Sequence, residues 1–366
     1  MGRLGRPTSA RPSDVVPDIQ GDVAATPSTG ASTSGGRALR VALRALVGVL
    51  VVVLLLARAD MRALVDSIAH VRPGYVVLAF AVLLLGLTVN AYRWQLFLRP
   101  VGLAQHVSEL LRLTFVGTFF NAFLPTGFGG DAYKSLRLRG AAGSMAPPLA
   151  TVFLDRLAGL VGLSLLALVG SVLQLTTGDH GRVTVAASLL SLGVLAVWGL
   201  ALWFCPRWAY RDEAASRVDS RMRAFARAFA TAGREPRAML WGTVVGGASA
   251  LLLITVFALL AAALGLSVPA GAFPGIVLIT SLMTILPLTI NGLGFREAIT
   301  VWCLAAYRVG HDEALAFALL VLAVTLASSA VGGIVYVVAP GPVADTNRVA
   351  SVGSRARRGP RTRSAG

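Results

Sequence analysis

The chain contains six apolar stretches that are each long enough to cross a lipid bilayer as a helix. Crossing the hydrocarbon layer takes about 20 apolar residues in an α-helix. Hydrophobic residues make up 55% of the 366-residue sequence and charged residues only 14%, which leaves too little polar surface for a soluble domain. We therefore expect an all-α, polytopic membrane protein with full spans at about 38–57, 74–92, 149–175, 183–204, 239–265 and 313–338.

Two further apolar segments, at about 108–132 and 273–309, are interrupted by proline and glycine next to charged residues. Pro125 in the first and Pro287 in the second each follow a leucine and precede a glycine-rich stretch. Every backbone N–H and C=O group in a bilayer needs a partner, so such breaks persist only where protein or a water-filled cavity covers them. We interpret both segments as re-entrant helical hairpins, with pairs of short or tilted full spans as the alternative.

The distribution of arginine predicts the orientation of the chain. The loop 205–238 contains eight arginines, whereas 176–182 and 266–272 contain one between them, which places the first inside and the other two outside. Both termini then lie in the cytoplasm, with disordered tails at 1–36 and 341–366 around a cytoplasmic-membrane domain at 37–340. The two hairpins enter from opposite sides, as an inverted-topology repeat would produce.

The basic loop contains a pattern of its own. Val218, Met222, Phe225 and Phe229 recur at helical spacing among arginines. This pattern predicts a basic amphipathic helix that lies on the anionic lipids of the inner leaflet. We favour the other interpretation of the same pattern, an ordinary positively charged loop helix that only fixes the topology.

The first break has the residue types of an anion site. Its glycines let a ligand approach the backbone closely, and the helix expected to follow would direct its N-terminus toward the same spot. Basic side chains on that helix can pair with a phosphate, or they are simply positive-inside residues. The acid at the start of the helix suits a capping position. The candidate residues are Gly127, Gly129, Gly130, Asp131, Lys134 and Arg137.

An adjacent pair of opposite charges, Asp155 and Arg156, lies within the span 149–175. A charged residue inside a span costs ~2.5–3.5 kcal/mol, so we expect both to face a polar cavity near the glycine loop. Neighbouring residues on a helix do not face each other, so different partners are expected: Lys134 for Asp155, and the substrate for Arg156. The alternative is that Arg156 extends to the inner interface.

The second break resembles the first. Asn291, Gly292 and Gly294 precede Arg296 and Glu297, which open the next helical stretch. Glu297 suits a helix N-terminus, and Arg296 can hold an anionic headgroup from the outer side. A purely structural ion pair between Arg296 and Glu297 is the alternative.

Four motifs in this order resemble the membrane region of the lysylphosphatidylglycerol synthase family, over about residues 40–340. The resemblance implies a flippase-like domain, which moves an aminoacylated phospholipid between leaflets while a separate soluble domain transfers the amino acid from tRNA. We expect a stand-alone member without that transfer activity, whose lipid need not be lysylphosphatidylglycerol. The family pattern favours a basic residue, often arginine, where this chain has Lys134. The motifs are Arg93-Trp94, Asn121 through Asp131, Asp155-Arg156, and Leu286-Pro287 through Glu297.

These observations favour a translocator of an anionic phospholipid or a polyprenyl-linked glycolipid, with no catalytic residue, metal or cofactor. Nucleic acid is not an expected partner, because the arginines cluster at the chain ends and in loops between apolar runs. One alternative is a membrane glycosyltransferase with Asp60 or Asp66 as an outer-loop acid. Another is a non-catalytic partner of an envelope-lipid enzyme such as a glycosyltransferase.

Overall fold

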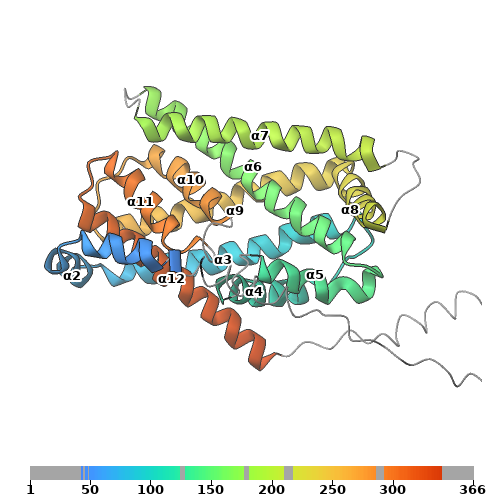
Figure 1. The fold of residues 1–366 in the computed structure, drawn as a ribbon, viewed down its shortest axis with the longest axis horizontal. Coiled ribbons are helices and arrows are strands. Elements are labelled where there is room, and N and C mark those ends of the chain that lie inside the picture. Colours follow the sequence, from blue (N-terminus) through green and yellow to red (C-terminus); the bar gives the residue numbers. More distant parts are fainter. Residues whose placement is uncertain are drawn as a thin grey trace, which may run out of the picture. The chain divides into compact units, whose positions relative to one another are not determined.

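The structure is a computed structural model that describes residues 49–123, 128–176, 181–209, 217–285 and 292–339, together with 43, 46 and 47. Of the predicted site residues, Pro125, Gly127, Pro287 and Asn291 lie outside the described residues, as do the predicted tails. The chain divides into Met1–Arg40 and Val41–Gly366, and the fold is that of the second unit. All regular structure in the described ranges is helical (Figure 1).

Within the described part of the chain, five helices are long and apolar enough to cross a membrane. They correspond to five of the six predicted spans, and they establish the chain as an all-α, polytopic membrane protein. The remaining prediction, 38–57, is described only in part and is helical at 49–57. The first of the five ends at Leu98 rather than near residue 92, because its last turns are buried in the protein. The five are α3 (Pro73–Leu98), α6 (Ala146–Thr176), α7 (Arg182–Ala209), α9 (Pro236–Ala263) and α12 (His311–Val338).

Both broken segments consist of two short helices that pack against each other. At ~1.5 Å per residue none of the four reaches across the ~30 Å hydrocarbon layer. The first pair is α4 (Val107–Phe123) with α5 (Gly129–Ala142), and the second is α10 (Phe273–Ile285) with α11 (Phe295–Ala305). Each segment thus has the helix–break–helix form predicted from its proline and glycines.

The contacts between helices have an internal symmetry. The pairs α3–α4, α4–α5, α5–α6 and α4–α12 all make contacts, and so do α9–α10, α10–α11, α11–α12 and α10–α6. Exchanging α3 with α9, α4 with α10, α5 with α11 and α6 with α12 therefore reproduces the same set of neighbours. The sequence halves are thus two copies of one helix arrangement.

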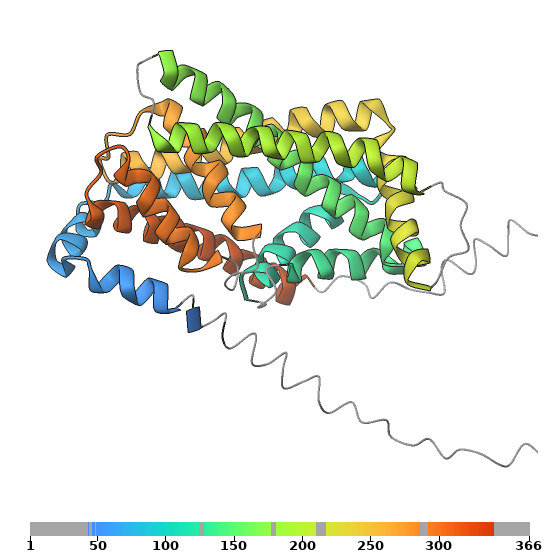
Figure 2. The same ribbon diagram turned by 45° about the horizontal axis from the view of Figure 1, so that its top comes forward.

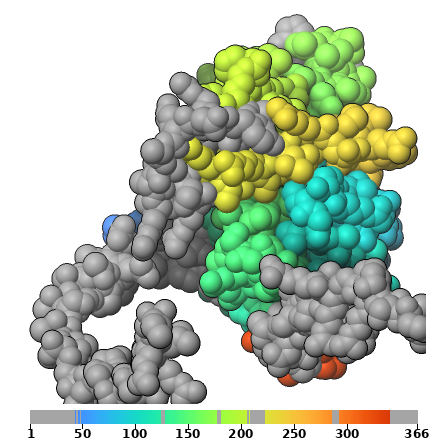
Figure 3. Space-filling view, turned by 90° about the vertical axis from the view of Figure 1, so that its right-hand side faces the viewer, coloured from blue at the N-terminus to red at the C-terminus, as the bar shows by residue number. Residues whose placement is uncertain are grey.

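The two copies run in opposite directions. The Arg72 N–H donates to the Ala263 carbonyl at 3.0 Å where α3 begins and α9 ends. At the other end of this antiparallel pair, the Phe97 ring packs against Gly242. Figure 3 shows the two helices side by side, with α3 in cyan and α9 in yellow. This is the arrangement of an inverted-topology repeat.

The two helix pairs begin at opposite ends of the long helices. The Arg112 side chain at the start of α4 donates to the Ala339 carbonyl at the end of α12. By contrast, Gly271 just before α10 packs on Gly170 near the end of α6. Figures 1 and 2 accordingly show α4 and α5 to the right and α10 and α11 to the left.

Small residues allow the long helices to approach closely. A Cβ added to Gly162 of α6 would lie 2.4 Å from the Gly247 nitrogen of α9, and one added to Gly246 would lie 2.6 Å from the Ala158 carbonyl oxygen. Lipid chains are as apolar as the side chains of a helix, so in a bilayer close packing of this kind, and not the hydrophobic effect, drives helix association. Along α7, in contrast, Leu189, Leu192, Val197 and Leu200 are exposed and available to lipid chains.

The predicted amphipathic helix exists as α8 (Arg217–Gly233) and packs on α6 and α7. The ring centroid of Phe153 lies 6.0 Å from that of Phe225 and 6.3 Å from that of Phe229. Phe229 is only 1% exposed, so its ring packs within the protein and does not lie on lipid. Met222 remains exposed. The apolar face of α8 is thus largely a packing surface.

Two smaller helical elements complete the described fold. The helix α2 (Met61–Ala69) lies before α3, and the 3-10 turn η1 (Ala270–Ala272) leads into α10.

Candidate functional site

A cavity of about 300 Å³ lies between α3, α6 and α9, near the middle of these helices and beside the end of α10. Its lining changes from polar to apolar along the helices. On α3 the polar lining residues lie toward the end of the helix and the apolar ones toward its start. On α9, which runs in the opposite direction, the polar residue comes before the apolar ones, so both helices place their polar residues at the same end of the cavity. The polar lining residues are Asn90, Arg93, Arg156, Ser249, Ser281 and Thr284, and the apolar ones include Val82, Leu83, Leu87, Leu160, Leu163 and Leu253.

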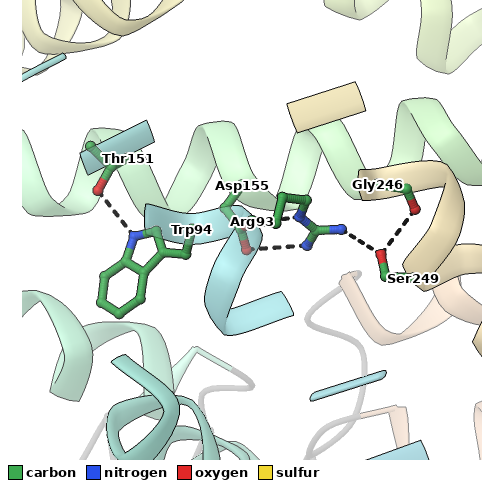
Figure 4. Close-up of polar contacts among 6 residues, drawn as sticks. All are labelled: Arg93, Trp94, Thr151, Asp155, Gly246 and Ser249. Carbon is green, nitrogen blue, oxygen red and sulfur yellow. Dashed lines mark hydrogen bonds and ion pairs between the residues drawn. The ribbon is translucent and has the colours of Figure 1, made fainter. Parts of the chain in front are cut away.

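Arg93 is the most firmly held charge of the cavity (Figure 4). Its Nε and Nη2 donate to the two carboxylate oxygens of Asp155 at 2.7 and 3.2 Å. Its Nη1 donates to the Ser249 hydroxyl at 2.8 Å, and that hydroxyl donates to the Gly246 carbonyl. A bidentate pair of this kind fixes orientation as well as charge. Arg93 therefore connects α3, α6 and α9 at mid-depth.

A glycine makes room for the guanidinium group of Arg93. Gly159 lies one turn after Asp155 on α6, and a Cβ at this position would lie 2.9 Å from Arg93 Nη1. Any larger residue would displace the guanidinium from its carboxylate.

Arg156 is the more accessible cation of the cavity. Its Nε forms an ion pair with Asp131, and the two side chains are 32% and 8% exposed. The Phe128 ring covers the guanidinium at 5.3 Å from its centroid. Asp131 lies in the first turn of α5, directly after the first break. The broken helix pair is thereby connected to the cavity through one ion pair.

Asn121 stabilises the start of α5. Its side-chain oxygen accepts a hydrogen bond from the Gly130 N–H at 2.8 Å, across the break between α4 and α5. Gly130 in turn packs directly on Gly117, because neither residue has a side chain. The carboxylate of Asp131 is therefore directed to Arg156, whereas the sequence analysis assigned it a capping role.

Lys134 lies about one turn after Asp131 on α5. Its Nζ is 5.2 Å from the centroid of the Trp94 ring, a cation–π contact. The Trp94 indole is buried and donates to the Thr151 hydroxyl at 3.2 Å. Within the described part of the chain, Lys134 Nζ forms no hydrogen bond or ion pair.

The predicted pairing of Asp155 with Lys134 is wrong. Asp155 binds Arg93, and Arg156 binds Asp131. Successive residues on a helix point about 100° apart, so Asp155 faces α3 while Arg156 faces α5. The span predicted from the sequence ended near residue 92, which left Arg93 just outside it. The available signal was Asn90, a second polar side chain one turn before Arg93.

The second break contributes the end of α10 to the cavity, but not its charged pair. Gly292 has a φ of 75° and packs on Thr284, so the chain returns to the end of α10. The Glu297 carboxylate accepts from the Gly294 N–H at 2.6 Å and from Arg296 Nη2 at 2.9 Å. Among the described lining residues of the cavity, neither Arg296 nor Glu297 occurs. Arg296 and Glu297 therefore form the structural ion pair that was the alternative interpretation of these two residues.

Arg137 also lies away from the cavity, with its Nε donating to the Tyr133 hydroxyl at 3.2 Å. The outer acids considered for an enzyme have structural contacts. Asp60 caps α2 by accepting from the Arg62 N–H at 2.9 Å, and Asp66 lies 3.3 Å from a ring nitrogen of His70. The described residues contain no cluster of His, Cys, Asp and Glu that could hold a metal ion.

Fold and site together define a polytopic helical membrane protein with two broken helix pairs around a charged, amphipathic cavity. The family described as Lysylphosphatidylglycerol synthase TM region matches residues 41–333, and the chain belongs to this family. No curated protein matches the chain. The family connects the chain with membrane lipids, and the family resemblance found in the sequence motifs is confirmed.

Proposed function

We propose that the protein moves an anionic lipid between the two leaflets of the membrane that it spans. Its headgroup would pass through the cavity while its chains remain among the apolar residues and the surrounding lipid. The family membership supports a lipid as the ligand, since the matched residues include every helix that lines the cavity.

The observation that carries this proposal is the polarity gradient of the cavity. Arg93 and Arg156 lie at its polar end, and Leu83 and Leu253 lie at its apolar end. Such a lining matches a molecule with a charged head and a hydrocarbon tail. A bare charge is costly in hydrocarbon, so a lined passage is the main requirement for moving a phosphate headgroup.

The two arginines have different parts in this proposal. Arg93 is held by Asp155 and Ser249, so it contributes a fixed positive potential. Arg156 is a third exposed and has one carboxylate partner, so its guanidinium can turn to a lipid phosphate. Arginine binds phosphate with two parallel hydrogen bonds, which favours this exchange.

The position of the cavity also supports transport. It lies midway along α3 and α9, between two helix pairs that begin at opposite ends of the long helices. Inverted repeats with broken helices place their substrate sites at this depth, where rocking of one repeat exposes the site to either side.

Leaflet exchange in liposomes tests the proposal. We expect the reconstituted protein to accelerate exchange of a fluorescent phosphatidylglycerol, and Arg156→Ala to slow this exchange by roughly tenfold, the effect of about 1.4 kcal/mol. Arg182→Ala, the same change at an exposed position away from the cavity, is the matched control and should exchange like the parent. Exchange that survives Lys134→Ala and Arg156→Ala together would overturn the site. A complete lack of exchange with phospholipids and prenyl lipids would overturn transport itself.

A further inference from the structure

The charged side chains around Arg156 form one cluster that contains more cations than carboxylates. Arg93 pairs with Asp155 and Arg156 pairs with Asp131. Lys134 lies within electrostatic reach of all four of these residues. Three cations therefore share two carboxylates, and the cluster carries one excess positive charge.

Among the residues that the structure describes, the excess charge has no anion of its own. Lys134 is half-buried and rests on the Trp94 ring, without a hydrogen bond or ion pair from the described residues. A charge withheld from water without a paired anion is unfavourable. A ligand that brings one negative charge into the cluster would remove this deficit.

Spacing along α5 shows how the cluster would receive such a ligand. Asp131 and Lys134 are three residues apart on one helix, so their side chains lie on the same face. When a phosphate takes over Arg156, the Asp131 carboxylate can pair with Lys134 one turn away. Each of the three cations then has one anion, and no carboxylate is left unpaired.

We propose that the lipid bound in the cavity carries a single net negative charge, as a phosphodiester headgroup does. A diphosphate would bring excess negative charge, and a zwitterionic headgroup would leave Lys134 unmatched. This inference rests on the proposed function for the site, and it narrows the substrate to one charge class. Both a diacyl phospholipid and a prenyl-phosphoryl sugar contain this headgroup chemistry.

Binding selectivity in detergent solution tests the inference separately from transport. The probes are phosphatidylglycerol with one charge, phosphatidylcholine with none, and phosphatidic acid at pH 8, where a phosphomonoester is nearly doubly ionised because its second pKa is about 6. The parent protein should prefer phosphatidylglycerol to both of the others. Lys134→Gln should reduce its preference over phosphatidylcholine by roughly tenfold, because the cluster then carries no excess positive charge. Lys134→Arg should retain the preference.

A second variant shifts the balance in the other direction. Asp131→Asn adds one positive charge to the cluster, so it should move the preference from phosphatidylglycerol toward phosphatidic acid. Arg139→Gln removes one positive charge, as Lys134→Gln does, but on the exposed side of α5, so it is the control for that variant and should leave selectivity unchanged. Retained selectivity in both Lys134→Gln and Asp131→Asn would overturn the inference, and the second variant remains informative if the first does not fold.

Two further comparisons complete the test. A prenyl-phosphoryl hexose as fourth probe distinguishes the lipid sources, because it has the same charge on an isoprenoid chain. Tighter binding than phosphatidylglycerol would assign the site to prenyl lipids. Charge-selective binding without leaflet exchange would contradict the proposed function and leave this inference standing. Leaflet exchange at an equal rate for all headgroup charges would contradict this inference and leave the proposed function standing.

Discussion

Arg93 and Asp155 form a bidentate ion pair that joins α3 to α6, with nitrogen–oxygen distances of 2.7 and 3.2 Å. Their side chains are only 7% and 13% exposed, so each charge depends on the other. Apolar and glycine contacts and a second ion pair, between Arg156 and Asp131, also hold the helices together. Loss of the Arg93–Asp155 pair would weaken the contact between two of the helices that form the cavity.

We predict that removing one member of this pair is strongly destabilising. Asp155→Ala should lower the free energy of unfolding by ~3–5 kcal/mol, because a buried guanidinium is left without its counter-charge. The double variant Arg93→Met with Asp155→Leu should cost less than the sum of the single changes. Thermal unfolding of the purified protein in detergent measures both.

The contact between Asp66 and His70 provides the control, because these side chains are 74% and 78% exposed. Exposed ion pairs contribute only ~0–1 kcal/mol, so Asp66→Ala should change stability little. An Asp155→Ala variant as stable as Asp66→Ala would contradict the role assigned to the buried pair.

We predict that Gly159→Ala disturbs the same ion pair without removing a charge. The new methyl group would lie 2.9 Å from Arg93 Nη1 and 3.2 Å from Arg93 Cζ, so the guanidinium must move away from Asp155. Overpacking of this kind costs ~1–3 kcal/mol. Gly193→Ala, which meets nothing within 4 Å, is the matched control in α7. Equal unfolding temperatures for the two variants would contradict the tight contact between Gly159 and the Arg93 guanidinium.

The contact between Gly117 and Gly130 leads to a prediction about the first broken helix pair. A Cβ on Gly130 would lie 2.0 Å from the Gly117 carbonyl oxygen, which is backbone and cannot give way. A Cβ on Gly117 would lie 2.9 Å from Lys134 Cε, part of a flexible side chain. Gly130→Ala should therefore lower the unfolding temperature more than Gly117→Ala, and the opposite order would contradict the close approach of α4 and α5.

Much of the fold could be predicted from the sequence, because hydrocarbon imposes one length and one composition on every span. The breaks were equally visible, since proline and glycine beside charge have few solutions in a bilayer. The position of the end of α3 could not be predicted in the same way. Arg93 and Trp94 have the composition of an interface, and only the presence of Asp155 and Thr151 on α6 shows that they are buried.

The partners of the charged residues in the site could not be predicted from the sequence either. A spacing on one helix says which residues share a face, but not which neighbouring helix that face meets. Asp155 and Arg156 were correctly expected to have different partners, and the choice between Lys134, Arg93 and Asp131 depended on packing. The glycine contact between α6 and α9, which determines that packing, involves close approaches that no sequence pattern specifies.

The inverted arrangement predicts where labels can reach the chain. Ser144 precedes α6, and Ser267 follows α9 at the end where α6 also finishes, so the two residues lie at opposite ends of the long helices. With the arginine-rich loops inside, a cysteine at Ser144 should react with a membrane-impermeant maleimide only from the cytoplasm, and one at Ser267 only from outside. The measurement uses intact cells and inverted vesicles in a Cys205→Ser background, where the remaining Cys303 is buried. Labelling of both positions from one side would refute the inverted topology, whereas labelling of each from the side opposite to that expected would retain the repeat and reverse its orientation.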